Sequence, residues 1–153
     1  MIGFSIAVVT LILQSQNLNK NFGLQIVIGL YIFSILLNFS SIEFLTLSSW
    51  EDTNFVWWNA LGASLYGSAK VFMIISLSLT CLVLMKFFYL ALGTLAFFSF
   101  FELFYYYERL VDKKVEQGTN SESNNVRWAA RIAMLLEIAF GFVLIFWIKP
   151  YIT

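Results

Sequence analysis

Residues 55–85 read FVWWNALGASLYGSAKVFMIISLSLTCLVLM, an apolar and small-residue stretch that only one charged side chain, Lys70, interrupts. A helix that crosses a bilayer needs about 20 consecutive, mainly apolar residues, and this stretch is longer than that. Trp57 and Trp58 at its start are typical of the aromatic belt at a membrane surface. The stretch therefore predicts a transmembrane helix, and it makes the expected fold class an all-α integral membrane protein.

The composition of the whole chain agrees with this prediction. Of its 153 residues, 60% are hydrophobic and 12% are charged, whereas soluble domains have about 45–50% and 25%. The net charge is zero, which excludes the basic footprint of a nucleic-acid binder. The chain has no histidine and one cysteine, Cys81, so it lacks the ligands of haem, zinc and iron–sulfur sites. We therefore expect no metal and no cofactor in this chain, and no nucleic-acid partner.

The apolar stretches define the expected domain organisation. Residues 1–153 are predicted to form a single membrane domain, with helices at about 1–13, 24–47, 55–85, 87–107 and 128–148 and a hydrophilic loop at 108–127. This gives about five transmembrane helices, or four if the first lies in the membrane interface. Lys86 is the expected hinge between the third and fourth helices.

Lys70 lies far from both ends of its apolar stretch, and a charge at the bilayer centre costs at least about 2.5–3.5 kcal/mol. Asn59, Tyr66 and Lys70 are spaced by seven and four residues, so they share one helix face. Small residues at four-residue spacing border this face, and such patterns allow a second helix to approach closely. The helix-packing candidates are Ala60, Ala63, Ser64, Gly67 and Ser68. We therefore expect the Lys70 face to contact protein and not lipid.

The helix at 24–47 carries a second polar stripe, in which Tyr31, Ser34, Asn38 and Ser41 are spaced by three, four and three residues. Two interpretations follow. In the first, the two stripes form interhelical hydrogen bonds and Lys70 pairs with a carboxylate. In the second, they line a proton path, for which the candidates are Tyr31, Asn38, Tyr66, Lys70 and Glu102.

The other ionisable residues lie nearer the ends of their helices. Glu43 is expected to be solvated, and Glu102, which precedes a run of three tyrosines, is expected to reach interfacial water. Arg131 and Glu137 are six residues apart, so we expect them to point to different faces and not to pair with each other.

Two short motifs resemble subunits of respiratory complex I, the NADH:ubiquinone oxidoreductase. Ile28-Gly29-Leu30 after an Asn-rich turn, and Ser64-Leu65 followed by Gly67, Ser68 and Ala69, occur in the same order in its small 4L chain. The resemblance covers roughly residues 1–85. In that family two membrane glutamates carry protons, whereas here Tyr31 stands at the first position and Ala69 or Lys70 at the second. Tyr66-Gly67-Ser68-Ala69 also resembles a segment of subunit 6 of the same enzyme, which has five helices.

The resemblance implies a non-catalytic subunit in the membrane arm of this proton-pumping oxidoreductase. Its partners would be the other membrane subunits and lipids, in the mitochondrial inner membrane. The many Phe, Leu, Ile, Asn and Ser residues indicate AT-rich codons, which are common in organelle genomes. The alternatives are a supernumerary structural or assembly subunit of a large respiratory complex, or a small transporter subunit. The chain lacks the inverted repeat of Gly- or Pro-broken helices that is typical of transporters.

Overall fold

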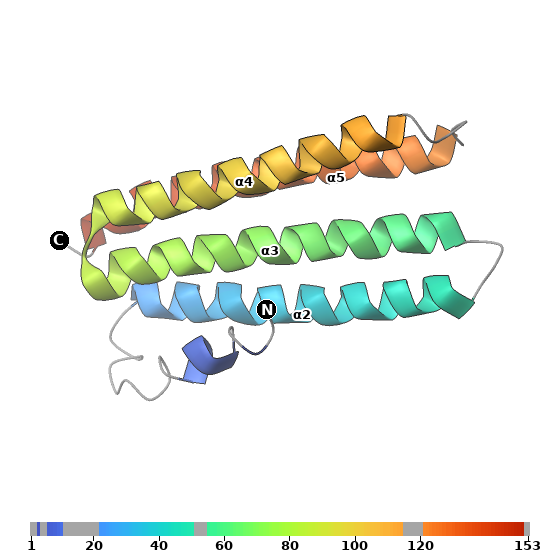
Figure 1. Ribbon diagram of the computed structural model, residues 1–153. Coiled ribbons are helices and arrows are strands. Elements are labelled where there is room, and N and C mark those ends of the chain that lie inside the picture. Colours follow the sequence, from blue (N-terminus) through green and yellow to red (C-terminus); the bar gives the residue numbers. More distant parts are fainter. Residues whose placement is uncertain (1–2, 4–5, 11–21, 51–54, 115–120, 152–153) are drawn as a thin grey trace.

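The structure is a computed structural model that describes residues 3, 6–10, 22–50, 55–114 and 121–151. Its long helices are α2 (Phe22–Trp50), α3 (Phe55–Met85), α4 (Phe88–Lys114) and α5 (Ser121–Ile148), and a 3-10 turn, η2 (Lys149–Tyr151), follows α5. These helices run side by side, each antiparallel to the one before it (Figure 1). No strand occurs among the described residues, which confirms the all-α fold class.

Three of the predicted membrane spans have the length and hydropathy that a span requires. Among the described residues these are the segments Phe22–Leu47, Trp58–Met85 and Arg131–Tyr151. The described apolar part of α4, Phe88–Phe104, is shorter. The expected five spans, or four, are therefore confirmed for three helices, which a fourth, shorter apolar helix accompanies. Most of the first expected helix, 1–13, lies outside the described residues.

The predicted bounds are confirmed for one helix, whereas the helices expected at 24–47, 87–107 and 128–148 are longer in the structure, at Phe22–Trp50, Phe88–Lys114 and Ser121–Ile148. The helix expected at 55–85 is α3, Phe55–Met85. The hydrophilic loop expected at 108–127 is wrong over most of its length, because α4 continues to Lys114 and α5 already begins at Ser121. Hydropathy shows where the apolar stretch ends, whereas Glu, Arg, Leu and Lys side chains at 108–114 still favour helix.

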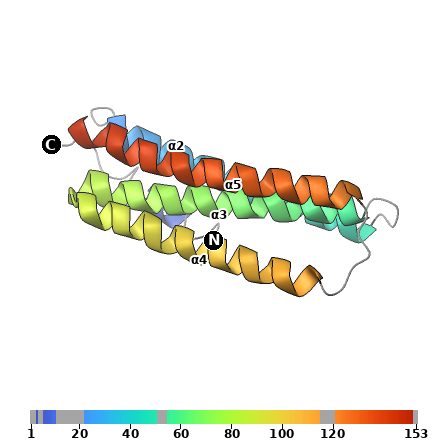
Figure 2. The same cartoon turned by 90° about the horizontal axis from the view of Figure 1, so that it is seen from above.

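Helix α3 is the centre of the bundle, since α2, α4 and α5 all pack against it (Figures 1 and 2). The α2–α3 seam has the three-and-four spacing of an antiparallel coiled coil. On α2 the buried seam residues are Leu24, Val27, Tyr31, Ser34, Asn38 and Ser41, and on α3 they include Ala69, Ser76, Leu79 and Val83. The polar stripe predicted at 24–47 thus lies at the centre of the α2 face that packs against α3.

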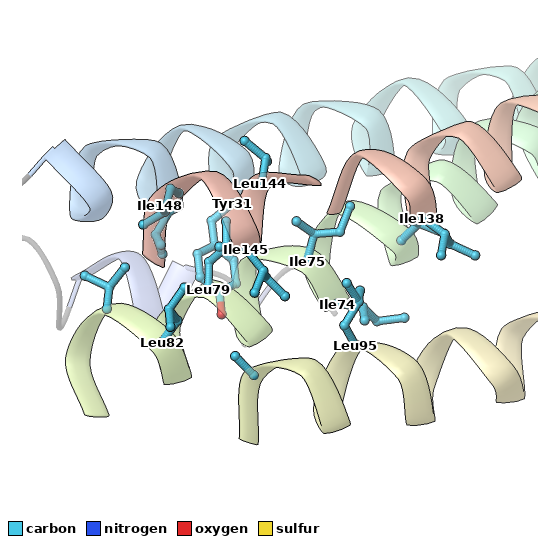
Figure 3. Packing of buried hydrophobic residues seen from close by; sticks show 14 of the residues in the cluster. Tyr31, Ile74, Ile75, Leu79, Leu82, Leu95, Ile138, Leu144, Ile145 and Ile148 are labelled. Carbon is cyan, nitrogen blue, oxygen red and sulfur yellow. The ribbon is translucent and has the colours of Figure 1, made fainter. Parts of the chain in front are cut away.

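The core lies where α2, α3, α4 and α5 meet. Tyr31, Ile75, Leu79, Leu95 and Ile145 are fully buried there, as Figure 3 shows.

Gly141 allows α5 to approach this core closely. A Cβ atom on Gly141 would lie 2.7 Å from Ile75 Cγ1 and 3.3 Å from Leu95 Cδ2. Because real Cβ atoms essentially never approach other atoms that closely, the position of α5 against α3 and α4 depends on this glycine having no side chain.

The connection between α3 and α4 consists of Lys86 and Phe87, so the hinge predicted at Lys86 is confirmed. Lys86 has a φ of 56°, a left-handed conformation that glycine adopts far more easily than other residues. Its N–H group donates a hydrogen bond to the Leu82 carbonyl at 3.1 Å. Lys149 Nζ lies 4.2 Å from the centre of the Phe88 ring, which brings η2 to the same end of the bundle.

Candidate functional site

Lys70 forms an ion pair with Glu102 of α4. Lys70 Nζ lies 3.3 Å from Glu102 Oε1, and the two side chains are 22% and 24% exposed. The ammonium group also lies 5.1 Å from the centre of the Tyr66 ring. The pairing of Lys70 with a carboxylate, which the first interpretation required, is therefore present near the middle of the α3 span.

Glu102 points into the bundle because of its place on α4. It follows Ala91, Leu95 and Ser99 at spacings of three and four residues, and these three residues are buried. The expectation that Glu102 reaches interfacial water is therefore corrected. Its short distance along the sequence from the tyrosine run gave no information on which face of α4 it occupies.

The polar stripe of α2 forms hydrogen bonds with the backbone of α3. Ser34 Oγ donates to the Ala69 carbonyl and Ser41 Oγ donates to the Gly62 carbonyl, each at 2.7 Å. Asn38 Nδ2 donates to the Ser34 carbonyl at 2.9 Å within α2. The stripe therefore meets the small residues of α3 and not the face that carries Lys70. The two predicted polar stripes do not meet.

Tyr31 is the member of the α2 stripe that belongs to the hydrophobic core. Its side chain is fully buried, and Tyr31 Oη has no hydrogen-bond partner among the described residues. Thr80 and Cys81 lie near it, and the Thr80 hydroxyl donates to the Ser76 carbonyl at 2.7 Å. Thr80 is ten residues along α3 from Lys70, or about 15 Å at 1.5 Å per residue. The proton-path candidates thus divide into two groups, with Tyr31 and Asn38 apart from Tyr66, Lys70 and Glu102.

The small residues expected to pack against a neighbouring helix are not those at the closest contact. A Cβ atom on Gly67 would meet nothing within 4 Å, whereas one on Gly62 would lie 2.8 Å from Leu45 Cγ and 3.1 Å from the Leu45 backbone nitrogen. Ala63 is exposed, and Ala60, Ser64 and Ser68 are half-buried. The Ser64 hydroxyl donates to the Ala60 carbonyl within α3. Several small-residue series run along α3, and the seam residues of α2 decide which of them is in contact.

Glu137 is a polar residue in the bundle that is not among the predicted site residues. Glu137 Oε2 is buried and has no hydrogen-bond partner among the described residues, and Ser68 is close enough to its carboxyl group to interact with it. The contact between Gly141 and Ile75 places Glu137, one helical turn earlier, at the depth of Lys70, because alternate helices of the bundle run parallel (Figure 1). Ser68 and Lys70 are two residues apart, which is about 200° around a helix. Glu137 and the ion pair therefore lie at one depth on opposite sides of α3.

The spacing of residues along α5 indicates that Glu137 lies on the packed side of this helix. Glu137 lies three residues after Met134 and four before Gly141, and both are buried. Arg131 lies instead beneath Trp128, with its guanidinium carbon 4.5 Å from the centre of the indole ring.

The described residues contain no group of three or more His, Cys, Asp or Glu side chains that could hold a metal ion. What the arrangement offers is one ion pair and one further carboxyl group, at the same depth and on three different helices. Such groups can hold or exchange protons inside a membrane. No family model matches the chain, and neither does any curated protein or solved structure.

Proposed function

We propose that this chain is a non-catalytic membrane subunit of a multisubunit, proton-translocating respiratory complex. The observation that carries the proposal is the Lys70–Glu102 ion pair, 3.3 Å between Nζ and Oε1, in the middle of an apolar bundle. Removing an ion from water costs several kcal/mol. A protein in which apolar side chains of similar volume replace a buried ion pair is often as stable or more stable. Intramembrane ionisable residues are accordingly rare, and many of them mark proton or ion pathways.

The exposure of the pair supports a subunit rather than an isolated bundle. The side chains of Lys70 and Glu102 are 22% and 24% exposed, and Tyr66 beside them is 43% exposed. In a bundle surrounded only by lipid, this polar surface would face hydrocarbon at the most costly depth. A neighbouring membrane chain that covers it would remove this cost.

The specific complex in the proposal is the membrane arm of NADH:ubiquinone oxidoreductase in the mitochondrial inner membrane. The resemblance of Ile28-Gly29-Leu30 and of residues 64–69 to its small membrane subunits supports this choice, and these segments lie on the adjacent helices α2 and α3. The chain would contribute polar residues to the proton-translocating arm, while electron carriers would belong to other subunits.

The second candidate is a supernumerary structural or assembly subunit of a large respiratory complex. The hydrogen bonds from Ser34 and Ser41 to the α3 backbone favour it, because these contacts stabilise helix packing without any transport role. In this case the ion pair would also be a packing contact. A small transporter subunit is the third candidate.

Two experiments separate these candidates. Membranes are solubilised in a mild detergent and separated by native electrophoresis. Co-migration of the chain with NADH dehydrogenase activity is expected, whereas migration as a small oligomer would indicate a transporter and contradict the proposal.

The second experiment measures quinone-coupled proton pumping in Lys70→Met, with Lys86→Met as the matched control. We expect an assembled complex with reduced pumping in Lys70→Met only. A complex that fails to assemble, and that the charge-swapped variant Lys70→Glu/Glu102→Lys restores in full, would indicate the structural role.

A further inference from the structure

We infer that Glu137 is a proton-binding carboxyl group in the membrane, on the side of α3 opposite the Lys70–Glu102 pair. This role deepens the proposed function by naming a residue that exchanges a proton, and it rests on that function only for the path that the proton takes. Proton binding by the Glu137 carboxyl group is a property of this chain alone, so it can be tested on the purified chain.

The geometry at Glu137 is that of an enclosed carboxyl group. Glu137 borders the face of α5 that packs on α3, where Met134, Ile138 and Gly141 are buried. One carboxyl oxygen, Oε2, is buried without a hydrogen-bond partner among the described residues. The polar neighbour that interacts with the group is Ser68 of α3.

This environment suits a carboxyl group that carries a proton. An ionised carboxylate has about four acceptor positions to satisfy, and a buried charge without enough donors is costly. A protonated carboxyl group is neutral and needs far less solvation. We therefore expect Glu137 to be protonated while α5 packs against α3, and to release its proton when water or a neighbouring subunit reaches it.

The charged groups around Glu137 have contacts elsewhere. On α3, Lys70 lies at the same depth but points to the other side of the helix, where it pairs with Glu102 of α4. On α5, Arg131 lies beneath Trp128. On the part of α2 that the structure describes, the charged residue is Glu43, which is exposed. The surroundings of Glu137 are thus mainly apolar, with a serine hydroxyl as the nearest partner.

The test uses N,N′-dicyclohexylcarbodiimide on the purified chain in detergent. This apolar reagent reacts with protonated carboxyl groups: the carboxyl proton moves to one carbodiimide nitrogen and a carboxyl oxygen bonds to the central carbon. The adduct then rearranges to a stable N-acylurea without losing an atom. Peptide mass spectrometry locates the modified residue, also in the presence of other reactive side chains.

At neutral pH we expect about tenfold more modification of Glu137 than of Glu102, and a decrease of about tenfold for each pH unit once the carboxyl group is mainly ionised. Glu137→Gln should remove the adduct. Lys70→Met is the positive control, because it removes the ammonium partner from Glu102 and leaves that carboxyl group free to react with the reagent.

Two results would overturn the inference. The first is an unmodified Glu137 in a sample where Glu102 of the Lys70→Met variant reacts. The second is protection of Glu137 by sodium ions at constant pH, which would assign the site to a metal cation. Reaction at Glu137 in a chain that does not co-migrate with NADH dehydrogenase activity would contradict the proposed function and leave this inference standing.

Discussion

Removing one member of the Lys70–Glu102 pair should destabilise the bundle more than removing both. Breaking a fully buried pair costs about 3–5 kcal/mol, because one charge is left without compensation. In the purified chain in detergent no neighbouring subunit covers the Lys70 and Glu102 side chains, which are 22% and 24% exposed. The pair is therefore less enclosed than a fully buried one, and we expect about 2 kcal/mol for each single variant. The variants are Lys70→Met and Glu102→Gln, which retain the size of the side chains.

The double variant Lys70→Met/Glu102→Gln leaves no charge and should cost about 1 kcal/mol or less. The coupling free energy between the two positions would then be about 3 kcal/mol, at the upper end of measured pairs. The exposed residues Lys86 and Glu43 provide matched controls, Lys86→Met and Glu43→Gln, for which surface changes of about 0.5 kcal/mol are expected.

The assay is thermal unfolding in detergent, followed by the reaction of Cys81 with a maleimide dye. Cys81 is the only cysteine in the sequence and is half-buried in the fold, so its reactivity should rise on unfolding. A loss of 2 kcal/mol corresponds to a decrease in Tm of about 4–8 °C for a chain of this length. Single variants that unfold like the wild type, or a double variant whose loss equals the two single losses added together, would refute the reasoning.

The remaining predictions use the same assay. Gly62→Val should lower the free energy of unfolding by about 2 kcal/mol, because its side chain would collide with Leu45, whereas Gly67→Val, which meets open space, should change it by less than about 0.5 kcal/mol; equal effects would contradict the α2–α3 contact. Lys86→Gly should raise the free energy by about 0.5–1 kcal/mol, because glycine adopts the φ of 56° without steric cost; a loss would argue against the left-handed hinge. Tyr31→Phe should be neutral or stabilising by about 1 kcal/mol, since Oη has no partner among the described residues, and a clear loss of stability would reveal a bonded water or a bond to Thr80.

The features that local sequence encodes were predicted well. The bounds of α3 and the hinge at Lys86 follow from the length of an apolar stretch and from the charge that ends it. The three-and-four spacing of Tyr31, Ser34, Asn38 and Ser41 correctly identified one face of α2. These features depend on residues within a few helical turns of each other, so periodicity and hydropathy suffice to find them.

The candidate site was predicted only in part, because its members come from different helices. Lys70 was recognised as a charged residue inside an apolar stretch. The sequence did not identify Glu102 as its partner, because the two residues are on different helices, α3 and α4. The contact at Gly62 in place of Gly67 depends on where Leu45 of α2 lies. Glu137 was set aside because it was compared only with Arg131 on its own helix.

By itself, the sequence determined that the chain is helical and that several of its helices are long and apolar enough to cross a membrane, because an apolar stretch of more than 20 residues that leaves water must satisfy its backbone hydrogen bonds within a helix. It also determined that Lys70 needs a partner, since an isolated charge in the bilayer is costly. The tertiary structure decided which carboxylate is that partner, which glycine admits a neighbouring helix, and that Glu137 shares the depth of the ion pair. The physical reason is that these contacts depend on the register and rotation of one helix against another. Shape complementarity along the whole seam fixes both, and no single helix contains that information.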